Sequence, residues 1–534
     1  MSAPINENQI VYSQASSYIK KLKEELASQL SSEVEIPVII GGKKIYTKQK
    51  QKIICPHDHQ HVLGYYHKAS AEEIMMAQNL IANNGGANSN WRKMSIDDRA
   101  TVFLKAAELL SEKYRFKLNA ATMLGQSKTA LQAEIDSACE LIDFWRFNVH
   151  FMQEICSDQN LISPKGSLNR LEYRALEGFV LAITPFNFTA IAGNLPTAPA
   201  LMGNCVIWKP ASASMLSSYY IMEILKEAGL PDGVISMIPG DGAVIGDKLL
   251  NSRDLAGVHF TGSTHTFSNI WKTIGNNLSN NIYKTYPRIV GETGGKDYVF
   301  ASADADIDAL SVAMIKGSFE YQGQKCSAIS RAYIPKSIWN KLKDNMFEKL
   351  EKLKYGDVTD FDNFMGAVID QKSYNKTIQY IDEAKKSTSA KIIFGGQCSD
   401  QRGYFISPTI ILVDDPMYKT MREEIFAPVL SIYVYSDDKL DETLQILNNT
   451  SPYALTGAIF ARDREMISYL TGKLVDTAGN FYINDKPTGA VVGQQPFGGA
   501  RLSGTNDKAG SKHNLLRWTS LRSIKENFNP PTSL

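Results

Sequence analysis

The feature that most constrains the fold is an alternation between short apolar runs and helical patterns that begins near residue 178. The apolar runs lie at 178–184, 204–208, 234–238 and 257–261, and helical segments separate them at 212–228, 243–250 and 266–274. Strands that alternate with helices across short turns predict βαβ units and a parallel, doubly wound sheet. Such sheets bind nucleotides at the carboxyl ends of their strands, so this stretch predicts a nucleotide-binding domain.

The same alternation starts again after residue 291. Strands are expected at 299–300, 329–334, 429–435 and 456–460, and helices at 307–319, 337–353 and 439–447. We therefore expect an α/β protein with two doubly wound domains. Ahead of the first strands, residues 70–155 are expected to be largely helical, with the period of a regular α-helix across 130–151.

The expected boundaries divide the chain into five parts. These are an N-terminal helical extension at 1–34, a nucleotide-binding domain at 35–290, a second α/β domain at 291–485, a return segment at 486–514 and a terminal strand at 515–534. Within the first domain, the polar stretch 157–175 is expected to be a connecting segment. The terminal strand is expected to pair outside its own domain.

Composition excludes several functional classes. The 534 residues contain 57 Lys and Arg against 56 Asp and Glu, and a formal charge of +1 supplies no basic surplus for phosphate backbones. We therefore expect no nucleic-acid partner. The longest uncharged stretch, 178–208, contains Pro185, Pro196 and Pro199, which argues against a membrane span. The N-terminus lacks both the apolar core of a secretion signal and the acid-poor composition of a transit peptide.

Cysteines and histidines form no convincing metal-binding pattern. The six cysteines, at 55, 139, 156, 205, 326 and 398, include no CxxC pair, so reduced thiols are expected. His57, His59 and His61 alternate as ligands on one strand face would. No further cluster of ligands supports them, so we expect a solvated turn there and no metal site.

Two glycine-containing turns are candidates for phosphate binding. Residues 240–246 follow a strand and precede a helix, but their spacing differs by one residue from the dinucleotide fingerprint, which favours an ordinary tight turn. Phe260-Thr-Gly-Ser263 ends a strand and opens a helix, where free backbone N–H groups and the helix dipole attract an anion. Ser263 is also expected to cap that helix.

Cys326 and Glu292 are the candidate catalytic residues. Cys326 lies in a polar, glycine-containing stretch beside Lys325. A nearby cation in an exposed loop lowers the pKa of a thiol and makes it nucleophilic. Glu292 stands at a strand end among glycines, where a carboxylate can act as a general base on water. The alternative for Glu292 is a loop carboxylate that pairs with Lys296.

Taken in order, these segments resemble the aldehyde dehydrogenase superfamily from about residue 35 onward. The motifs that carry the resemblance are Glu292-Thr-Gly-Gly-Lys296, Gln322-Gly-Gln-Lys-Cys326, Thr184-Pro-Phe-Asn-Phe188, Trp208-Lys-Pro210, Phe260-Thr-Gly-Ser263, Glu423-Glu-Ile-Phe-Ala-Pro428 and Pro496-Phe-Gly-Gly499. The resemblance implies that family's fold, with an NAD-binding domain, a catalytic domain carrying Cys326 and a small strand element for oligomerisation. The runs at 142–148, 484–489 and 492–501 resemble the branch that oxidises glutamate γ-semialdehyde.

The resemblance also implies catalytic and cofactor roles. The Cys326 thiolate would attack the aldehyde carbon, the Asn187 side chain and the Cys326 backbone N–H would bind the oxyanion, and Glu292 would activate the water that hydrolyses the thioester. The implied cofactor is NAD, held by Lys209, Ser212, Thr261, Gly262, Ser263, Glu424 and Phe426. Many NAD-specific relatives carry glutamate where this chain has Ser212, so charge repulsion does not exclude NADP.

The implied substrate is L-glutamate γ-semialdehyde, a zwitterion that is oxidised to L-glutamate in proline catabolism. The resemblance places its carboxylate at Ser327 and at the backbone of Gly489 and Ala490. Its aliphatic part is expected between Phe186 and Phe497.

Other expectations complete this interpretation. Glu140 is expected to face the pocket from its helix. Two alternatives stay open, another semialdehyde as the substrate and a cysteine-dependent ester hydrolase without net redox. Family resemblance implies a homodimer or a higher homo-oligomer that pairs through residues 157–175 and 515–534. It also implies the mitochondrial matrix, with the cytoplasm as the alternative because no clear presequence is visible.

Overall fold

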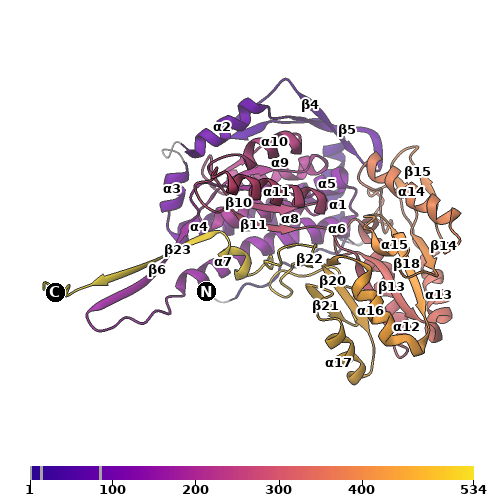
Figure 1. Cartoon of the computed structure of the whole chain (residues 1–534). Coiled ribbons are helices and arrows are strands. Elements are labelled where there is room, and N and C mark those ends of the chain that lie inside the picture. The colour runs from indigo at the N-terminus through magenta and orange to yellow at the C-terminus, as the bar shows by residue number, and fades with distance from the viewer. Residues whose placement is uncertain (1–2, 13–15, 83–86, 534) are drawn as a thin grey trace.

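The computed structural model describes residues 3–12, 16–82 and 87–533, and two seven-stranded sheets organise them (Figure 1). The first sheet has the order β11-β10-β7-β8-β9-β2-β3. Its strands are β2 (Val38–Ile40), β3 (Lys43–Ile45), β7 (Phe179–Ile183), β8 (Cys205–Lys209), β9 (Ile235–Met237), β10 (Leu255–Thr261) and β11 (Arg288–Glu292). The strands from β11 to β9 are parallel, whereas β2 and β3 are antiparallel. The expected doubly wound sheet is confirmed.

Helices connect the parallel strands of this sheet in sequence order. They are α8 (Thr189–Leu201), α9 (Met215–Glu227), α10 (Gly242–Leu250) and α11 (Thr264–Ser279). Alternate residues of β7 pack into different hydrophobic clusters, Phe179 and Leu181 into one and Val180 and Ala182 into another. Since successive strand side chains point to opposite faces, both faces of the sheet are buried. No helix in the described ranges is long and apolar enough to cross a bilayer.

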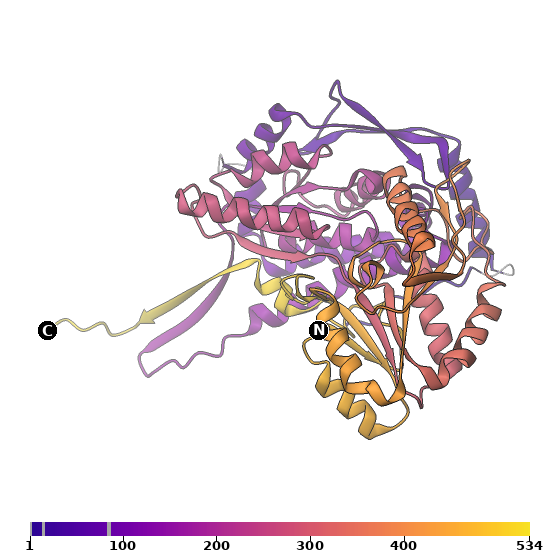
Figure 2. The same ribbon diagram turned by 45° about the vertical axis from the view of Figure 1, so that its right-hand side comes forward.

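The second sheet confirms the other expected α/β unit and has the order β14-β17-β18-β13-β12-β20-β21. Its strands are β12 (Asp297–Ala301), β13 (Ile329–Pro335), β14 (Ala390–Phe394), β17 (Thr409–Val413), β18 (Val429–Tyr435), β20 (Thr456–Phe460) and β21 (Asn480–Ile483). Its helices include α12 (Ile307–Phe319), α13 (Lys336–Leu350), α14 (Gln371–Lys386), α16 (Leu440–Thr450) and α17 (Arg464–Lys473). Figure 2 shows this unit beside the first one.

Strand β11 crosses the domain boundary that was expected at residue 290. It pairs with β10 along its whole length, from Arg288 opposite Gly257 to Glu292 opposite Thr261. The first sheet therefore carries Glu292 at the carboxyl end of an edge strand. Strand β12, in the second sheet, follows at Asp297, so Glu292 lies where the two sheets meet.

The expected helical region is confirmed, with one local difference. It contains α2 (Ala71–Ala82), α3 (Ala87–Lys93), α4 (Ile96–Leu109), α5 (Arg115–Gln126), α6 (Ala130–Ala133) and α7 (Glu140–Ser157), and α1 (Ser17–Leu30) precedes it. The regular period expected across 130–151 is wrong at Glu134–Cys139, which forms a π-helix. The wider turn lets Glu134 and Asp136 both face the interior, where they pair with Arg115 and Lys128.

A two-stranded ribbon projects from the body of the molecule (Figures 1 and 2). It consists of β6 (Ser167–Ala175) and β23 (Thr519–Asn527), antiparallel and paired from Ala175 opposite Thr519 to Ser167 opposite Asn527. The terminal strand was expected to begin at residue 515, but Leu515 belongs to helix α18 (Lys512–Leu516). Leu515, in α18, and Trp518, just after it, are fully buried. They fix this part of the chain to the body of the molecule before β23 begins at Thr519.

Candidate active site

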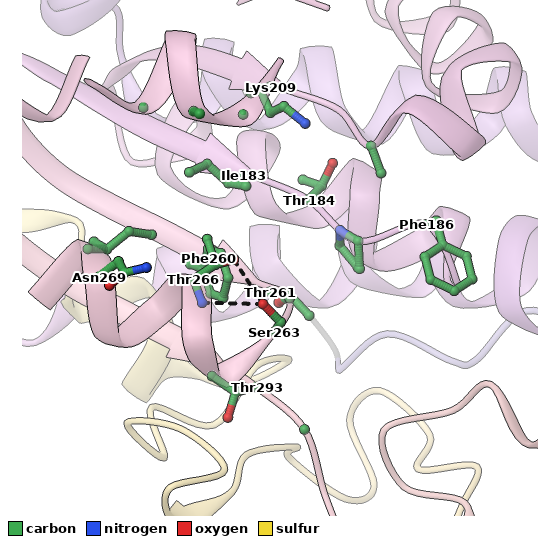
Figure 3. Close-up of a pocket in the computed structure, with 18 of the residues that line it drawn as sticks. Ile183, Thr184, Phe186, Lys209, Phe260, Thr261, Ser263, Thr266, Asn269 and Thr293 are labelled. Atoms are coloured by element: carbon green, nitrogen blue, oxygen red, sulfur yellow. Dashed lines mark hydrogen bonds between the residues drawn. The ribbon is translucent and has the colours of Figure 1, made fainter. Parts of the chain in front are cut away.

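Cys326 lies at the meeting point of two cavities. One cavity, of about 780 Å³, is formed largely by the ends of β7, β8 and β10, by α10 and by the N-terminal part of α11 (Figure 3). The other, of about 520 Å³, is formed by α7, the segment 486–497 and residues 6–9. The residues that line both are Ile191, Phe260, Thr261 and Cys326. The thiol can therefore contact a ligand in either cavity.

The loop that carries Cys326 has an unusual backbone. Tyr321, Gln322 and Gly323 have φ values of 52°, 54° and 65°, three consecutive residues in the left-handed region. Only glycine adopts that region without steric cost, so this backbone persists only if its surroundings hold it in place. Neither the residue types nor their spacing in the sequence indicates this conformation.

The side chain of Gln322 supplies most of that restraint. Its amide nitrogen donates hydrogen bonds to the carbonyl oxygens of Ser127 (2.9 Å) and Ala367 (2.7 Å), and its amide oxygen accepts one from the Gly366 N–H (2.8 Å). The Tyr321 hydroxyl donates to the Gln126 carbonyl (2.9 Å). Sequence reasoning did not assign a role to either residue, although Gln322 belongs to the quoted cysteine motif.

Asn187 lies against the same loop. It is buried, and its Nδ2 donates a hydrogen bond to the Gln324 carbonyl oxygen at 3.0 Å. Asn187 and Cys326 both line the larger cavity. The structure thus brings together the expected nucleophile, Cys326, and the expected hydrogen-bond donor to the oxyanion, Asn187.

The expectation that Lys325 lowers the pKa of Cys326 is wrong. The Lys325 ammonium is buried and lies 3.4 Å from a Glu320 carboxylate oxygen and 3.9 Å from one of Asp136. Burial, followed by the negative charges of neighbouring carboxylates including Glu292, raises the pKa of the Cys326 thiol above its ordinary value. The thiol therefore needs a base before it can attack.

Glu292 has the position and the environment of such a base. Its Oε2 accepts a hydrogen bond from the Gly499 N–H at 3.0 Å. Burial raises the pKa of Glu292 well above its usual range, which makes the carboxylate a stronger proton acceptor than an exposed one. The alternative of a pair with Lys296 is wrong, since the buried Lys296 ammonium has no hydrogen-bond partner within the described ranges.

Of the residues expected at a cofactor, Lys209, Thr261, Gly262, Ser263, Glu424 and Phe426 line the larger cavity. Lys209 ends β8, and burial lowers the pKa of its ammonium. Ser263 caps α11, as expected, by accepting the Thr266 N–H (Figure 3). Ser212 differs, because it is exposed and its neighbour Ala211 lines the cavity instead.

Glu424 and Phe426 stand on a short turn at the other wall of this cavity. The Gly295 N–H donates to Glu424 Oε1 at 3.0 Å, and burial raises the pKa of that carboxyl. Phe426 has a φ of 63°, and its ring meets that of Phe186 edge to face with centroids 5.9 Å apart. Phe186 was expected at the substrate, but it lines the larger cavity, on the cofactor side. The chain turns after Phe186, and Phe188 lines the smaller cavity instead.

The other residues expected at a substrate, Glu140, Ser327, Gly489, Ala490 and Phe497, all line the smaller cavity. The Ser327 hydroxyl lies 2.8 Å from that of Thr488, and Gly489 has a φ of 91°, which glycine tolerates. Burial, then the charge of Asp136, raises the pKa of Glu140 well above its usual range. Sequence reasoning missed the charged groups Lys316, Lys325 and Lys486 that line the same cavity.

Metal binding has no structural support in the described residues. These contain no group of three or more His, Cys, Asp or Glu side chains arranged to hold an ion. The expected solvated turn is wrong for His57, which is buried with Nδ1 3.2 Å from the Ser127 hydroxyl. Burial lowers the pKa of His57 to about 4, so the ring is neutral. None of the six cysteines forms a disulfide.

Comparison with known proteins places this site in a family. The sequence profile described as the aldehyde dehydrogenase family matches residues 45–524. The mitochondrial Δ1-pyrroline-5-carboxylate dehydrogenase of Dictyostelium discoideum is 52% identical over 530 residues, which cover 99% of this chain and 94% of that protein. The mouse (Mus musculus) protein of the same name is 46% identical over 526 residues, 98% of this chain and 92% of its own length.

A solved structure of a related enzyme has the same fold as this chain. The crystal structure of Δ-pyrroline-5-carboxylate dehydrogenase from Mycobacterium tuberculosis bound with NAD superposes with a TM-score of 0.95 at 49% sequence identity, covering 100% of this chain and 97% of that one. By sequence and by fold, this chain belongs to the aldehyde dehydrogenase family.

Proposed function

We propose that this chain is an NAD-dependent dehydrogenase that oxidises L-glutamate γ-semialdehyde, the open form of Δ1-pyrroline-5-carboxylate, to L-glutamate in proline catabolism. The observation that carries the proposal is the position of Cys326 between a cavity built from strand ends and helix N-termini and a cavity lined by charges of both signs. A zwitterionic semialdehyde matches the second cavity. The names of the relatives support the same substrate.

The larger cavity fits a dinucleotide. The first turns of α10 and α11 have free backbone N–H groups, and both helices line this cavity. Lys209 lines it at the end of β8, and Glu424 and Phe426 form another part of the wall. NAD bound there supplies the hydride acceptor. Because Ser212 carries no charge, position 212 supplies no carboxylate to repel a 2′-phosphate, so NADP is not excluded there.

Covalent chemistry falls to three side chains. Glu292, whose negative charge reaches the thiol, accepts the proton that leaves Cys326 as the sulfur attacks the aldehyde carbon. The Asn187 amide and the Cys326 backbone N–H stabilise the oxyanion of the thiohemiacetal. With NAD bound, loss of hydride from that carbon would leave a thioester on Cys326. After Glu292 has released the thiol proton to solvent, it takes a proton from the attacking water. Hydrolysis then breaks the carbon–sulfur bond, frees Cys326 and releases the carboxylate product.

The smaller cavity orients the amino-acid end of the substrate. The Ser327 hydroxyl and the backbone of Gly489 and Ala490 are proposed to bind its carboxylate, and Glu140 to face its ammonium. Phe497 packs on the aliphatic part. Such a site rejects aldehydes without the charged end, because its buried polar groups would stay unpaired.

The test is NADH formation with pyrroline-5-carboxylate compared with propanal and butanal, followed at the same enzyme concentration. We expect kcat/KM to be higher for pyrroline-5-carboxylate by at least about a hundredfold. Preference for the simple aldehydes would overturn the assignment. Cleavage of an ester without NADH formation, as the only activity found, would assign a hydrolase instead.

We also propose a homodimer or a higher homo-oligomer and a location in the mitochondrial matrix. The ribbon of β6 and β23 exposes Leu168, Leu521 and Phe528 away from the body of the chain, and apolar groups on a projecting element favour contact with a second copy. Light scattering on the wild type and on Leu521→Asp tests the assembly. The relatives from Dictyostelium discoideum and mouse are named mitochondrial, and imaging of the tagged protein tests the location.

A further inference from the structure

An extended N-terminal segment, residues 3–12, lies along one wall of the smaller cavity. We call this segment the strap. Its residues Asn6, Glu7 and Gln9 line the cavity together with α7 and residues 489–495, which we call the substrate loop. Asn6 and Glu7 contact α7 although they lie more than 130 positions before it in the sequence. The strap was expected only to be part of a helical extension.

Asn6 joins the two opposite walls of the cavity. Its Nδ2 donates hydrogen bonds to Asp143 Oδ2 on α7 (2.8 Å) and to the Val492 carbonyl in the substrate loop (2.8 Å). Its Oδ1 accepts a hydrogen bond from Gln494 Nε2 (3.0 Å). Both N–H groups of the Asn6 amide and its oxygen are therefore used in one bridge between α7 and the loop.

The rest of the strap is fastened by buried ionic contacts. The Glu7 carboxylate pairs with Arg115 and with Arg146, each at 2.6 Å, and its side chain is 11% exposed. The Glu7 backbone N–H donates to Asp143 Oδ1 at 2.7 Å. The backbone N–H of Ile10 donates to Glu134, a fully buried carboxylate of the π-helix, at 2.9 Å.

These contacts make the strap part of the internal structure of the cavity wall. A buried carboxylate that loses a hydrogen-bond donor carries a large desolvation penalty. Asp143 takes two of its donors from the strap, and it lies one helical turn after Glu140 on α7. In the loop, Val492 follows closely after Gly489 and Ala490. The strap thus holds in register the two segments that face the amino-acid end of the substrate.

We propose that the strap, through Asn6, is a positioning element that sets the affinity of the site for its amino-acid semialdehyde. This inference rests on the proposed function, since it takes that substrate to occupy the smaller cavity. Asn6 acts through the substrate loop and α7, so it is a positioning residue and not a catalytic one. Its effect belongs to substrate binding and leaves the cofactor cavity unchanged.

The experiment measures kcat and KM for pyrroline-5-carboxylate, for propanal and for NAD in Asn6→Ala, Gln494→Ala and Ile5→Ala. Asn6→Ala removes the whole bridge, and we expect its KM for pyrroline-5-carboxylate to rise roughly tenfold. Gln494→Ala removes one of the three hydrogen bonds from an exposed side chain, and a rise of about two- to threefold is expected. Ile5 is 85% exposed, so Ile5→Ala is the matched control on the strap and should behave as the wild type.

A structural role alone would lower the melting temperature and leave the ratio of KM values unchanged. Equal KM values for pyrroline-5-carboxylate in Asn6→Ala and Ile5→Ala would overturn the proposal, as would an equal rise for propanal or NAD. If Asn6→Ala does not fold, the KM values of Gln494→Ala are compared with those of Ile5→Ala in the same way. Equal KM values for pyrroline-5-carboxylate in these two variants would then overturn the proposal. Absence of pyrroline-5-carboxylate oxidation by the wild type would instead refute the proposed function, so the two failures are distinguishable.

Discussion

The two cavities that meet at Cys326 are built in different ways. Apart from a few residues, the cofactor-side cavity is lined by a single stretch of chain between 183 and 273, which contains the ends of β7, β8 and β10 and parts of α10 and α11. The substrate-side cavity takes its lining from residue 6 to residue 514. One continuous part of the chain therefore forms most of the cofactor cavity, whereas the substrate cavity gathers its residues from the whole chain.

Electrostatics separates the cavities further. Lys316, Lys325 and Lys486 face the substrate side along with Asp136 and Glu140. Some of these charges are deeply buried, and Lys128 is fully buried against Asp136, where burial lowers its pKa to about 8. Buried charges are stable only as members of a satisfied network. More of these charges line the substrate side than the cofactor side, where Lys209 and Glu424 are the buried ones.

Replacement of Cys326, which lines both cavities, should have the largest effect on activity. Cys326→Ala is expected to lower kcat for aldehyde oxidation by on the order of 10⁴-fold or more, because no other nucleophile is placed at the junction. Binding of NAD, measured by calorimetry, should change by less than about twofold. Cys398→Ala, a free thiol remote from the site, is the control, and substantial residual turnover in Cys326→Ala would contradict this role.

Glu292→Gln should follow, with kcat lower by roughly 10²- to 10³-fold. Because burial raises the pKa of Glu292 well above 4.5, the carboxyl is protonated, and inactive as a base, below that raised value. Activity of the wild type should therefore fall as pH is lowered, starting well above pH 4.5. The residual activity of Glu292→Gln should not show this loss at low pH, because glutamine does not titrate. An identical pH profile in both proteins would exclude Glu292 as the base.

Lys209→Met tests the cofactor side alone. The ammonium at the end of β8 is expected to hydrogen-bond the cofactor, so its loss should raise the KM for NAD about tenfold and leave the KM for pyrroline-5-carboxylate unchanged. The exposed Lys248→Met on α10 is the matched control. A rise in the KM of the aldehyde as well would show that the two cavities are not independent.

Ser327→Ala is the corresponding test on the substrate side and should have the smallest effect. It removes one neutral hydroxyl, which the structure pairs with Thr488, so the KM for pyrroline-5-carboxylate should rise about three- to tenfold. Steady-state kinetics with saturating NAD measures this change. The KM for NAD and the KM for propanal should stay at wild-type values, and a change confined to kcat would argue against carboxylate binding by Ser327.

The success of sequence-based prediction follows the same division. Strands such as β18 and β20 and the helix α12 were placed at their observed bounds, because apolar periodicity and turn residues are local signals. The turn at 240–246 was interpreted as an ordinary turn, yet Gly242 and Gly246 line the cofactor cavity. This turn follows β9, which lies next to β8 in the sheet, and that placement brings the two glycines to the cavity. The spacing of the glycines in the sequence did not indicate it.

The sequence by itself determined the two doubly wound units and the residue types at the centre, a thiol and a carboxylate in glycine-containing segments. Only the tertiary structure decided their chemistry, since pKa values depend on burial and on charges from distant segments. It turned Lys325 toward Glu320 and away from Cys326, moved Phe186 to the cofactor side and brought Asn6 to the substrate loop. The contact of Asn6 with Val492 joins residues 486 positions apart, and only packing sets the distance between them.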